Sequence, residues 1–141
     1  LGGPRLRLIS LKRDVIIAIN TMPHDTSARG RKTLKFIRKI TPNHERNHNY
    51  YSYVRMLADS IHYPIKMMEK KDLQFYHADY GAEFTIKDEK NPYLEEFPVN
   101  RAFTMFKTNH GDVFLFYFFN KSLSTEEAKR ILKKTKGFIT Y

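Results

Sequence analysis

An uninterrupted run of apolar residues constrains the fold of this chain more than any other feature. Residues 113–119 read Val-Phe-Leu-Phe-Tyr-Phe-Phe, seven apolar side chains without a polar break. Successive side chains of a strand point to opposite faces of a sheet, so this run predicts a strand that is covered on both faces. The aromatic rings could instead stack on nucleobases, but the lack of alternation favours a core position over a base-stacking platform.

The segments around this run predict a β-β-α unit over residues 98–136. Residues 101–107 form a second strand pattern, and residues 109–112 (Asn-His-Gly-Asp) suit a hairpin turn between the two strands. Residues 124–127 (Ser-Thr-Glu-Glu) form a capping box, in which the serine and the third-position glutamate each satisfy a backbone amide. We therefore expect a C-terminal helix that ends near Gly137, a suitable C-cap residue.

The N-terminal part of the chain predicts a β-α-β unit over residues 13–57. Its β-branched run at 15–19 indicates a short buried strand, and the turn chemistry that follows leads into a helix over about 27–40. A strand near 50–57 is favoured over a helix there. Residues 58–97 are rich in charge and turns, and within them 73–77 and 83–87 could pair as a hairpin. The length of 141 residues corresponds to one domain, 1–141.

Charge is the other unusual property of the chain. It carries 25 Lys and Arg against 15 Asp and Glu, a net charge of +10. Residues 1–40 hold ten cations and two acids, whereas residues 41–141 hold fifteen cations and thirteen acids. Such asymmetry indicates a polyanionic partner, because like charges repel one another unless phosphates offset them. The ten cations that we predict to contact RNA are Arg5, Arg7, Lys12, Arg13, Arg29, Arg31, Lys32, Lys35, Arg38 and Lys39.

Several functional classes receive no support from the sequence. The chain has no cysteine, which excludes disulfides, thiolate metal sites and thiol catalysis. It also lacks glycine-rich nucleotide loops and apolar runs long enough to cross a membrane, so we expect no cofactor, no metal and no membrane contact. One alternative remains open: His44, Glu45 and His48 spell H-E-x-x-H, the spacing of a zinc hydrolase, although the polar surroundings favour a loop.

Two parts of the chain, residues 13–57 and 97–136, together resemble a known domain. The matching segments are the strand at 15–19, Ser-Ala-Arg-Gly-Arg at 27–31, Phe-Pro at 97–98, the two strands with their turn at 109–111, and Asn-Lys-Ser at 120–122. This series resembles the thioredoxin-like domain of several mitochondrial ribosomal proteins and of a small accessory subunit of respiratory complex I. The resemblance implies an α+β (α/β thioredoxin-like) fold with a mixed sheet of about four strands, two main helices, and residues 58–97 as a long insertion.

The same resemblance implies a function. We expect a non-catalytic structural subunit of a mitochondrial ribosome in the matrix, bound to ribosomal RNA and to neighbouring ribosomal proteins, with no small-molecule substrate. The alternatives are the zinc hydrolase named above and an accessory subunit of a respiratory complex. The absence of cysteine agrees with a non-catalytic role, since a thioredoxin-like fold without thiols performs no thiol–disulfide exchange.

Overall fold

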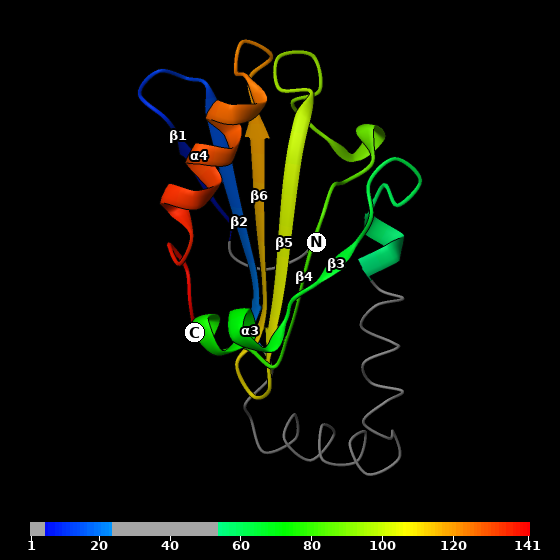
Figure 1. Ribbon diagram of the computed structural model, residues 1–141, viewed down its shortest axis with the longest axis vertical. Coiled ribbons are helices and arrows are strands. Elements are labelled where there is room, and N and C mark those ends of the chain that lie inside the picture. The colour runs from blue at the N-terminus through cyan, green and yellow to red at the C-terminus, as the bar shows by residue number, and fades with distance from the viewer. Residues whose placement is uncertain (1–4, 24–53) are drawn as a thin grey trace.

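Six strands form one open antiparallel sheet (Figure 1). The computed structural model describes residues 5–23 and 54–141 of the chain. The strands lie in the order β1-β2-β6-β5-β4-β3, and every neighbouring pair is antiparallel. The elements are β1 (Arg5–Ile9), β2 (Val15–Pro23), β3 (Lys66–Met67), α3 (Lys70–Tyr76), β4 (Tyr80–Phe84), the 3-10 turn η1 (Asp88–Lys90), β5 (Val99–Lys107), β6 (Gly111–Phe119) and α4 (Thr125–Thr135).

The central strand is β6, which pairs along its full length with β2 on one side and β5 on the other. Its apolar run is covered on both faces, as the sequence predicts. Leu115 and Tyr117 are buried on one face, and Phe114 and Phe118 are buried on the other. A strand with two apolar faces is stable only in the middle of a layered structure, so β6 determines where both cores form.

The two faces of the sheet carry separate cores. On one face α4 packs its partly buried apolar side chains against residues from β2 and β6, and Figure 1 shows α4 lying over these strands. On the other face Val54 and Ala58 pack against the sheet. The first core contains Val15, Ile17, Ile19, Leu115, Tyr117 and Phe119. The second contains Ile16, Val54, Ala58, Ala82, Phe84, Ile86, Phe97, Ala102 and Phe118.

The predicted β-β-α unit is confirmed. The three-residue connection between β5 and β6 places Asn109 in the left-handed region at φ 69°, where asparagine is tolerated better than most residues. At the start of α4 the capping box forms, because the Glu127 amide donates to Ser124 Oγ at 3.2 Å and the Ser124 amide donates to Glu127 Oε2 at 2.9 Å. Gly137 follows the helix end with φ 80°, consistent with its predicted capping role.

The predicted sheet is wrong. A four-stranded mixed thioredoxin-like sheet requires parallel strands joined by a helical crossover. Instead, β2 has antiparallel partners on both sides. The neighbouring strand β1 alternates arginine and leucine, the pattern of a half-exposed strand. It forms a hairpin with β2, and Arg13 in the connecting turn has a φ of 54°. The architecture remains α+β, with six strands rather than four.

The middle of the chain also differs from the prediction. Residues 58–97, expected as an insertion, supply β3, α3 and β4, and β4 pairs with β5. The hairpin of 73–77 with 83–87 is wrong, because most of its first half lies in α3. Residues 54–57 are helical rather than extended, since Val54 and Ala58 are both buried at i,i+4 spacing. The rest of the predicted 50–57 strand and the helix over 27–40 lie outside the described residues.

Candidate functional site

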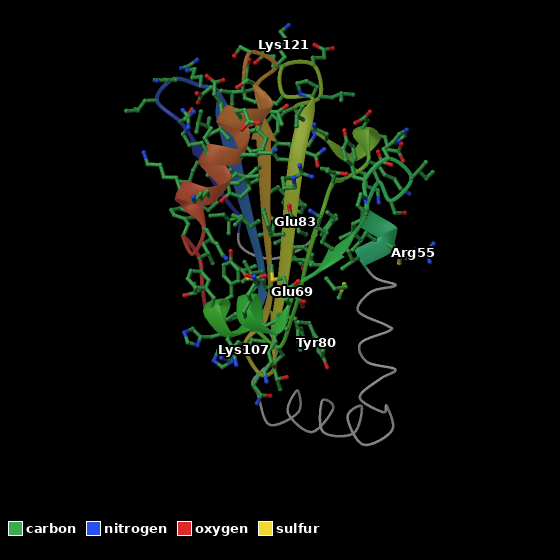
Figure 2. All side chains as sticks on the ribbon, viewed as in Figure 1. Arg55, Glu69, Tyr80, Glu83, Lys107 and Lys121 are labelled. Carbon is green, nitrogen blue, oxygen red and sulfur yellow. The ribbon has the colours of Figure 1, made fainter. Side chains whose placement is uncertain are left out.

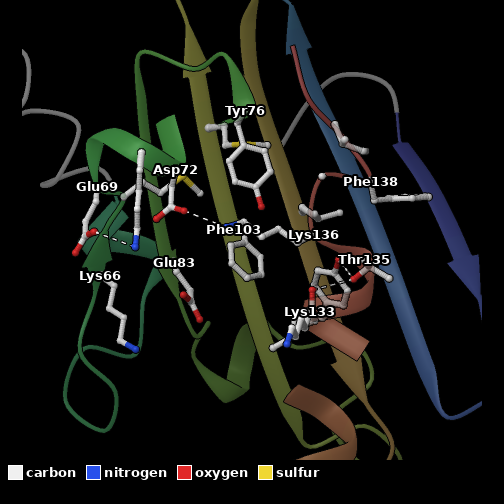
Figure 3. Close-up of a pocket in the computed structure, with 18 of the residues that line it drawn as sticks. Lys66, Glu69, Asp72, Tyr76, Glu83, Phe103, Lys133, Thr135, Lys136 and Phe138 are labelled. Carbon is white, nitrogen blue, oxygen red and sulfur yellow. Dashed lines mark hydrogen bonds and ion pairs between the residues drawn. The ribbon is translucent and has the colours of Figure 1, made fainter. Parts of the chain in front are cut away.

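A cleft of about 700 Å³ lies beside α4 on the face of the sheet that this helix covers (Figure 3). Its floor comes from β5 and β6 and is apolar: Met105, Leu115 and Tyr117 are buried, and Phe103 is half-buried. One wall is the second half of α4 and the residues after it, and the other is α3 with the residues around β3. Small-molecule sites have volumes of about 300–1,000 Å³, so the cleft is large enough for one ligand.

Contacts between α3 and the C-terminal segment 136–141 hold the α3 wall. We call them the α3 clasp. Lys136 Nζ lies 3.1 Å from Asp72 Oδ1 and 5.1 Å from the centroid of the Phe75 ring. The backbone N–H of Tyr141 donates to the Tyr76 carbonyl at 3.1 Å. The clasp therefore joins two segments that lie about sixty residues apart in the sequence and places the C-terminus beside α3 (Figure 1).

Lys107 extends the clasp at the end of β5 (Figure 2). Its Nζ donates to the carbonyl of His77, the C-cap residue of α3, at 2.8 Å. The same Nζ lies 6.0 Å from the centroid of the Tyr141 ring. The Tyr141 hydroxyl in turn lies 3.0 Å from the Met105 carbonyl and 2.6 Å from the Gly111 carbonyl. The C-terminal residue is thus anchored to the sheet as well as to α3.

Gly137 is the residue in the clasp that no other amino acid can replace without strain. Its φ of 80° lies in the left-handed region, which side chains with a Cβ adopt at a cost. A Cβ at this position would also lie 2.7 Å from the Phe75 ring. Glycine is therefore required for the backbone turn after α4, and its lack of a Cβ leaves room for the Phe75 ring.

Two phenol groups, those of Tyr76 and Tyr117, lie in the cleft. Burial raises the pKa of both, which leaves them protonated at neutral pH. The Tyr117 hydroxyl lies 2.7 Å from Thr135 Oγ1, and Thr135 itself donates to the Ile131 carbonyl. Tyr117 therefore donates its hydroxyl proton to Thr135 and does not offer it to a ligand. Near Tyr76, Lys136 and a hydrogen bond from the Gly137 amide partly oppose the effect of burial on its pKa.

The charged side chains of the cleft are unequally paired. Three carboxylates line the cleft in the described part of the chain, and each has a cationic partner: Glu69 with Lys71 at 3.7 Å, Asp72 with Lys136 at 3.1 Å, and Glu83 with Arg101 at 3.6 Å. Lys66 and Lys133 have no carboxylate within ion-pair distance among the described residues. Figure 3 shows these two lysines on opposite walls of the cleft, with Glu83 between them.

The predicted RNA-contacting residues lie elsewhere. Arg7, Lys12 and Arg13 have exposed side chains on β1 and its turn, and Arg5 is the first residue of β1. Arg7 Nη1 donates to the Tyr93 hydroxyl at 3.3 Å. The six remaining cations lie outside the described residues: Arg29, Arg31, Lys32, Lys35, Arg38 and Lys39. Arg7, Lys12 and Arg13 do not line the cleft.

The alternative zinc site, His44, Glu45 and His48, also lies outside the described residues. Within residues 5–23 and 54–141, no three His, Asp or Glu side chains are grouped so that they could hold a metal ion. In the same part of the chain, no helix is long and apolar enough to span a membrane.

The cleft was not among the predicted sites. Its polar residues come from 66–83 and 132–139, two segments that share no motif and that only the tertiary structure brings together. The one local signal is the glycine after α4, which the sequence marks as a cap but not as a contact of α3.

We compared the chain with known proteins, and no protein-family model, curated protein or solved structure matches it.

Proposed function

We propose that this protein is a non-catalytic RNA-binding protein that contacts phosphates through its basic N-terminal segment. The observation that carries this proposal is the division of charge between residues 1–40, with ten cations and two acids, and the nearly balanced remainder. A polyanion gains affinity from each cation that replaces a condensed counterion, and a run of cations without acids serves this purpose best.

The described part of the segment supports the proposal. Arg7, Lys12 and Arg13 are exposed on the hairpin of β1 and β2, and none of them has an ion pair among the described residues. The nearest acid in sequence, Asp14, is engaged with the hydroxyl of Ser10. Lys12 and Arg13 are therefore available to phosphates, and Arg7 has further guanidinium donors besides the Nη1 that contacts the Tyr93 hydroxyl. Contacts of this kind position a protein on RNA without reading its sequence.

A narrower form of the proposal places the protein in a mitochondrial ribosome, on ribosomal RNA and beside other ribosomal proteins. This form rests on the resemblance of residues 13–57 and 97–136 alone. The sheet that the resemblance implies is not the sheet that forms, so the RNA-binding proposal is argued from charge and does not depend on it.

The proposal is tested by the salt dependence of RNA binding. We would measure the affinity for a single-stranded RNA of about 20 nucleotides between about 50 and 300 mM KCl, a range over which phosphate contacts weaken strongly. The variant Arg31→Ala, Lys35→Ala, Arg38→Ala removes three of the proposed contacts. A matched control, Lys121→Ala, Arg130→Ala, Lys134→Ala, removes three exposed cations near or on α4 and lowers the net charge equally.

The slope of log affinity against log salt is expected to become shallower by about 2 in the N-terminal variant, because each phosphate contact on a single strand contributes about 0.7. The control is expected to keep most of the slope. Binding that does not respond to salt, or equal losses in the two variants, would contradict the proposal.

The two alternatives have their own tests. A zinc hydrolase built on His44, Glu45 and His48 requires stoichiometric zinc in the purified protein and loses its activity in Glu45→Gln. An accessory subunit of a respiratory complex would form protein cross-links in a lysate but no RNA adducts at residues 29–39, whereas the RNA-binding proposal expects such adducts.

A further inference from the structure

The cleft beside α4 is separate from the RNA-binding proposal, because none of its lining residues within 5–23 and 54–141 belongs to the proposed RNA-binding segment. Three of its properties bear on a ligand: a half-buried aromatic ring on its floor, two lysines with no carboxylate at ion-pair distance, and one phenol with no hydrogen-bond acceptor, the last two judged within residues 5–23 and 54–141.

The floor offers apolar surface that is still partly open. The Phe103 ring packs edge-on against Tyr117, with 5.9 Å between the ring centroids, and remains half-buried. Leu132 and Ile139 flank it from the wall formed by α4 and the C-terminal segment, and they too are only partly buried. An apolar ligand would remove this surface from water, which is favourable in proportion to the area covered.

The charges of the cleft select for an anion. Among the described lining residues, each of the three carboxylates has a cation within ion-pair distance, whereas Lys66, which lies opposite Glu83 in the β3–β4 register, and Lys133 have no carboxylate that close. Glu83 lies between them, and its pairing with Arg101 at 3.6 Å offsets its repulsion of an anionic ligand. An anion that reaches both lysines gains two charge-assisted contacts without displacing an existing ion pair.

The Tyr76 phenol adds a neutral donor at the α3 wall. Figure 3 shows its ring directed into the cleft. No acceptor for its own proton is present among the described residues, so this hydroxyl can donate to a ligand oxygen or nitrogen. The α3 clasp holds the tyrosine in place.

We propose that the cleft binds a small amphipathic organic anion, with an aromatic or aliphatic body on Phe103 and Leu132 and an anionic group held by Lys66 and Lys133. This proposal departs from the expectation that the protein has no small-molecule partner. It concerns binding, and it stands or falls independently of the RNA-binding proposal.

The test uses two fluorescent probes that differ only in charge. Anilinonaphthalene sulfonate has an aromatic body and an anionic group, and N-phenyl-1-naphthylamine has the same body without the sulfonate. The variant Lys66→Ala, Lys133→Ala is compared with Lys70→Ala, Lys134→Ala. The control removes two exposed lysines that are close to the first pair in sequence but do not line the cleft.

We expect the sulfonate to bind the Lys66→Ala, Lys133→Ala variant about tenfold more weakly than the unmodified protein, since charge-assisted contacts of this strength correspond to about one order of magnitude in affinity. The neutral probe is expected to bind both proteins within about twofold of each other, because it has no charge for the lysines to hold. The control variant is expected to bind both probes as the unmodified protein does.

Chemical shift changes on titration with the sulfonate are expected at Phe103, Leu115 and Leu132. They locate the probe in the cleft and distinguish it from a probe held by the basic N-terminal segment. The proposal is overturned if the sulfonate does not bind, if both lysine pairs have equal effects, or if the shift changes occur away from the cleft.

Discussion

The two helices that wall the cleft are held in different ways. The α4 helix has eleven residues, a complete capping box and a row of apolar side chains that packs on the first of the two cores. The α3 helix has seven residues, no side-chain cap and no member of either core cluster. A helix as short as α3 is not stable by itself in water, so its contacts with the rest of the protein must hold it.

The contrast shows where the site depends on local sequence and where it depends on tertiary structure. The α4 wall follows from signals within a few residues of the helix. The α3 wall depends on the α3 clasp. The two segments that form the clasp are separated in the sequence by β4, β5 and β6. Substitutions that weaken the packing of α4 should therefore destabilise the whole fold, whereas substitutions in the clasp should first destabilise α3.

The largest expected effect is that of Tyr117→Ala, which removes an aromatic side chain with an exposed fraction of 2% from the core under α4. We expect the free energy of unfolding to fall by about 4 kcal/mol, the usual cost of such a cavity. Urea denaturation followed by circular dichroism measures it. A loss below about 1 kcal/mol, typical of surface substitutions, would show that α4 is not part of the global core.

A smaller and more local effect is expected of Gly137→Ala. The left-handed backbone and the contact with the Phe75 ring together should lower the free energy of unfolding by about 2 kcal/mol. Amide chemical shifts should change mainly in α3 and in residues 136–141. The exposed Thr140→Ala substitution serves as a control and should change little. Shift changes spread evenly over the sheet would contradict a local role for the clasp.

High pH is expected to weaken the same C-terminal anchor. Burial raises the pKa of Tyr141 above its ordinary value of 10.0, so above pH 10 the unfolded chain loses this proton and the folded protein keeps it. The contribution of Tyr141 to stability is then constant with pH below about 10 and falls as pH rises further. Between pH 10 and 11 the fall should be about 1 kcal/mol smaller in Tyr141→Phe than in the unmodified protein. Equal falls would show that this hydroxyl is not buried.

The smallest effect concerns the capping box of α4. Ser124→Ala should lower the free energy of unfolding by about 1 kcal/mol, because it leaves the Glu127 amide without its acceptor. Ser122→Ala, two residues before the box, is the matched control and should have no measurable effect. Equal free energies of unfolding for the two variants, measured by urea denaturation, would contradict a stabilising role for the capping box of α4.

The parts of the fold that the sequence predicted are those with short-range signals. The capping box of Ser124 and Glu127, the turn at 109–112 and the apolar run at 113–119 each specify their structure within a few residues. The sheet could not be predicted in this way, because strand order depends on which apolar strands meet in space. The strand at 15–19 paired with β6 and β1 in antiparallel orientation, where a helical crossover to a parallel strand was expected.

The cleft was beyond prediction for a related reason. Lys66 and Lys133 belong to elements that are remote in sequence, and each alone is an ordinary surface lysine. Their lack of a partner has meaning only because the neighbouring carboxylates are paired with other cations, as Glu83 is with Arg101. Such pairing depends on side-chain geometry, which charge counts along a sequence do not contain.

Native-state hydrogen exchange tests the difference between the two walls most directly. The amide of Ala128, hydrogen-bonded within α4, should exchange with a free energy close to that of global unfolding. The amide of Leu73, hydrogen-bonded to the Glu69 carbonyl in α3, should exchange through local opening at a clearly lower free energy. Equal protection of the two amides would contradict the account, because it would mean that α3 unfolds only with the core.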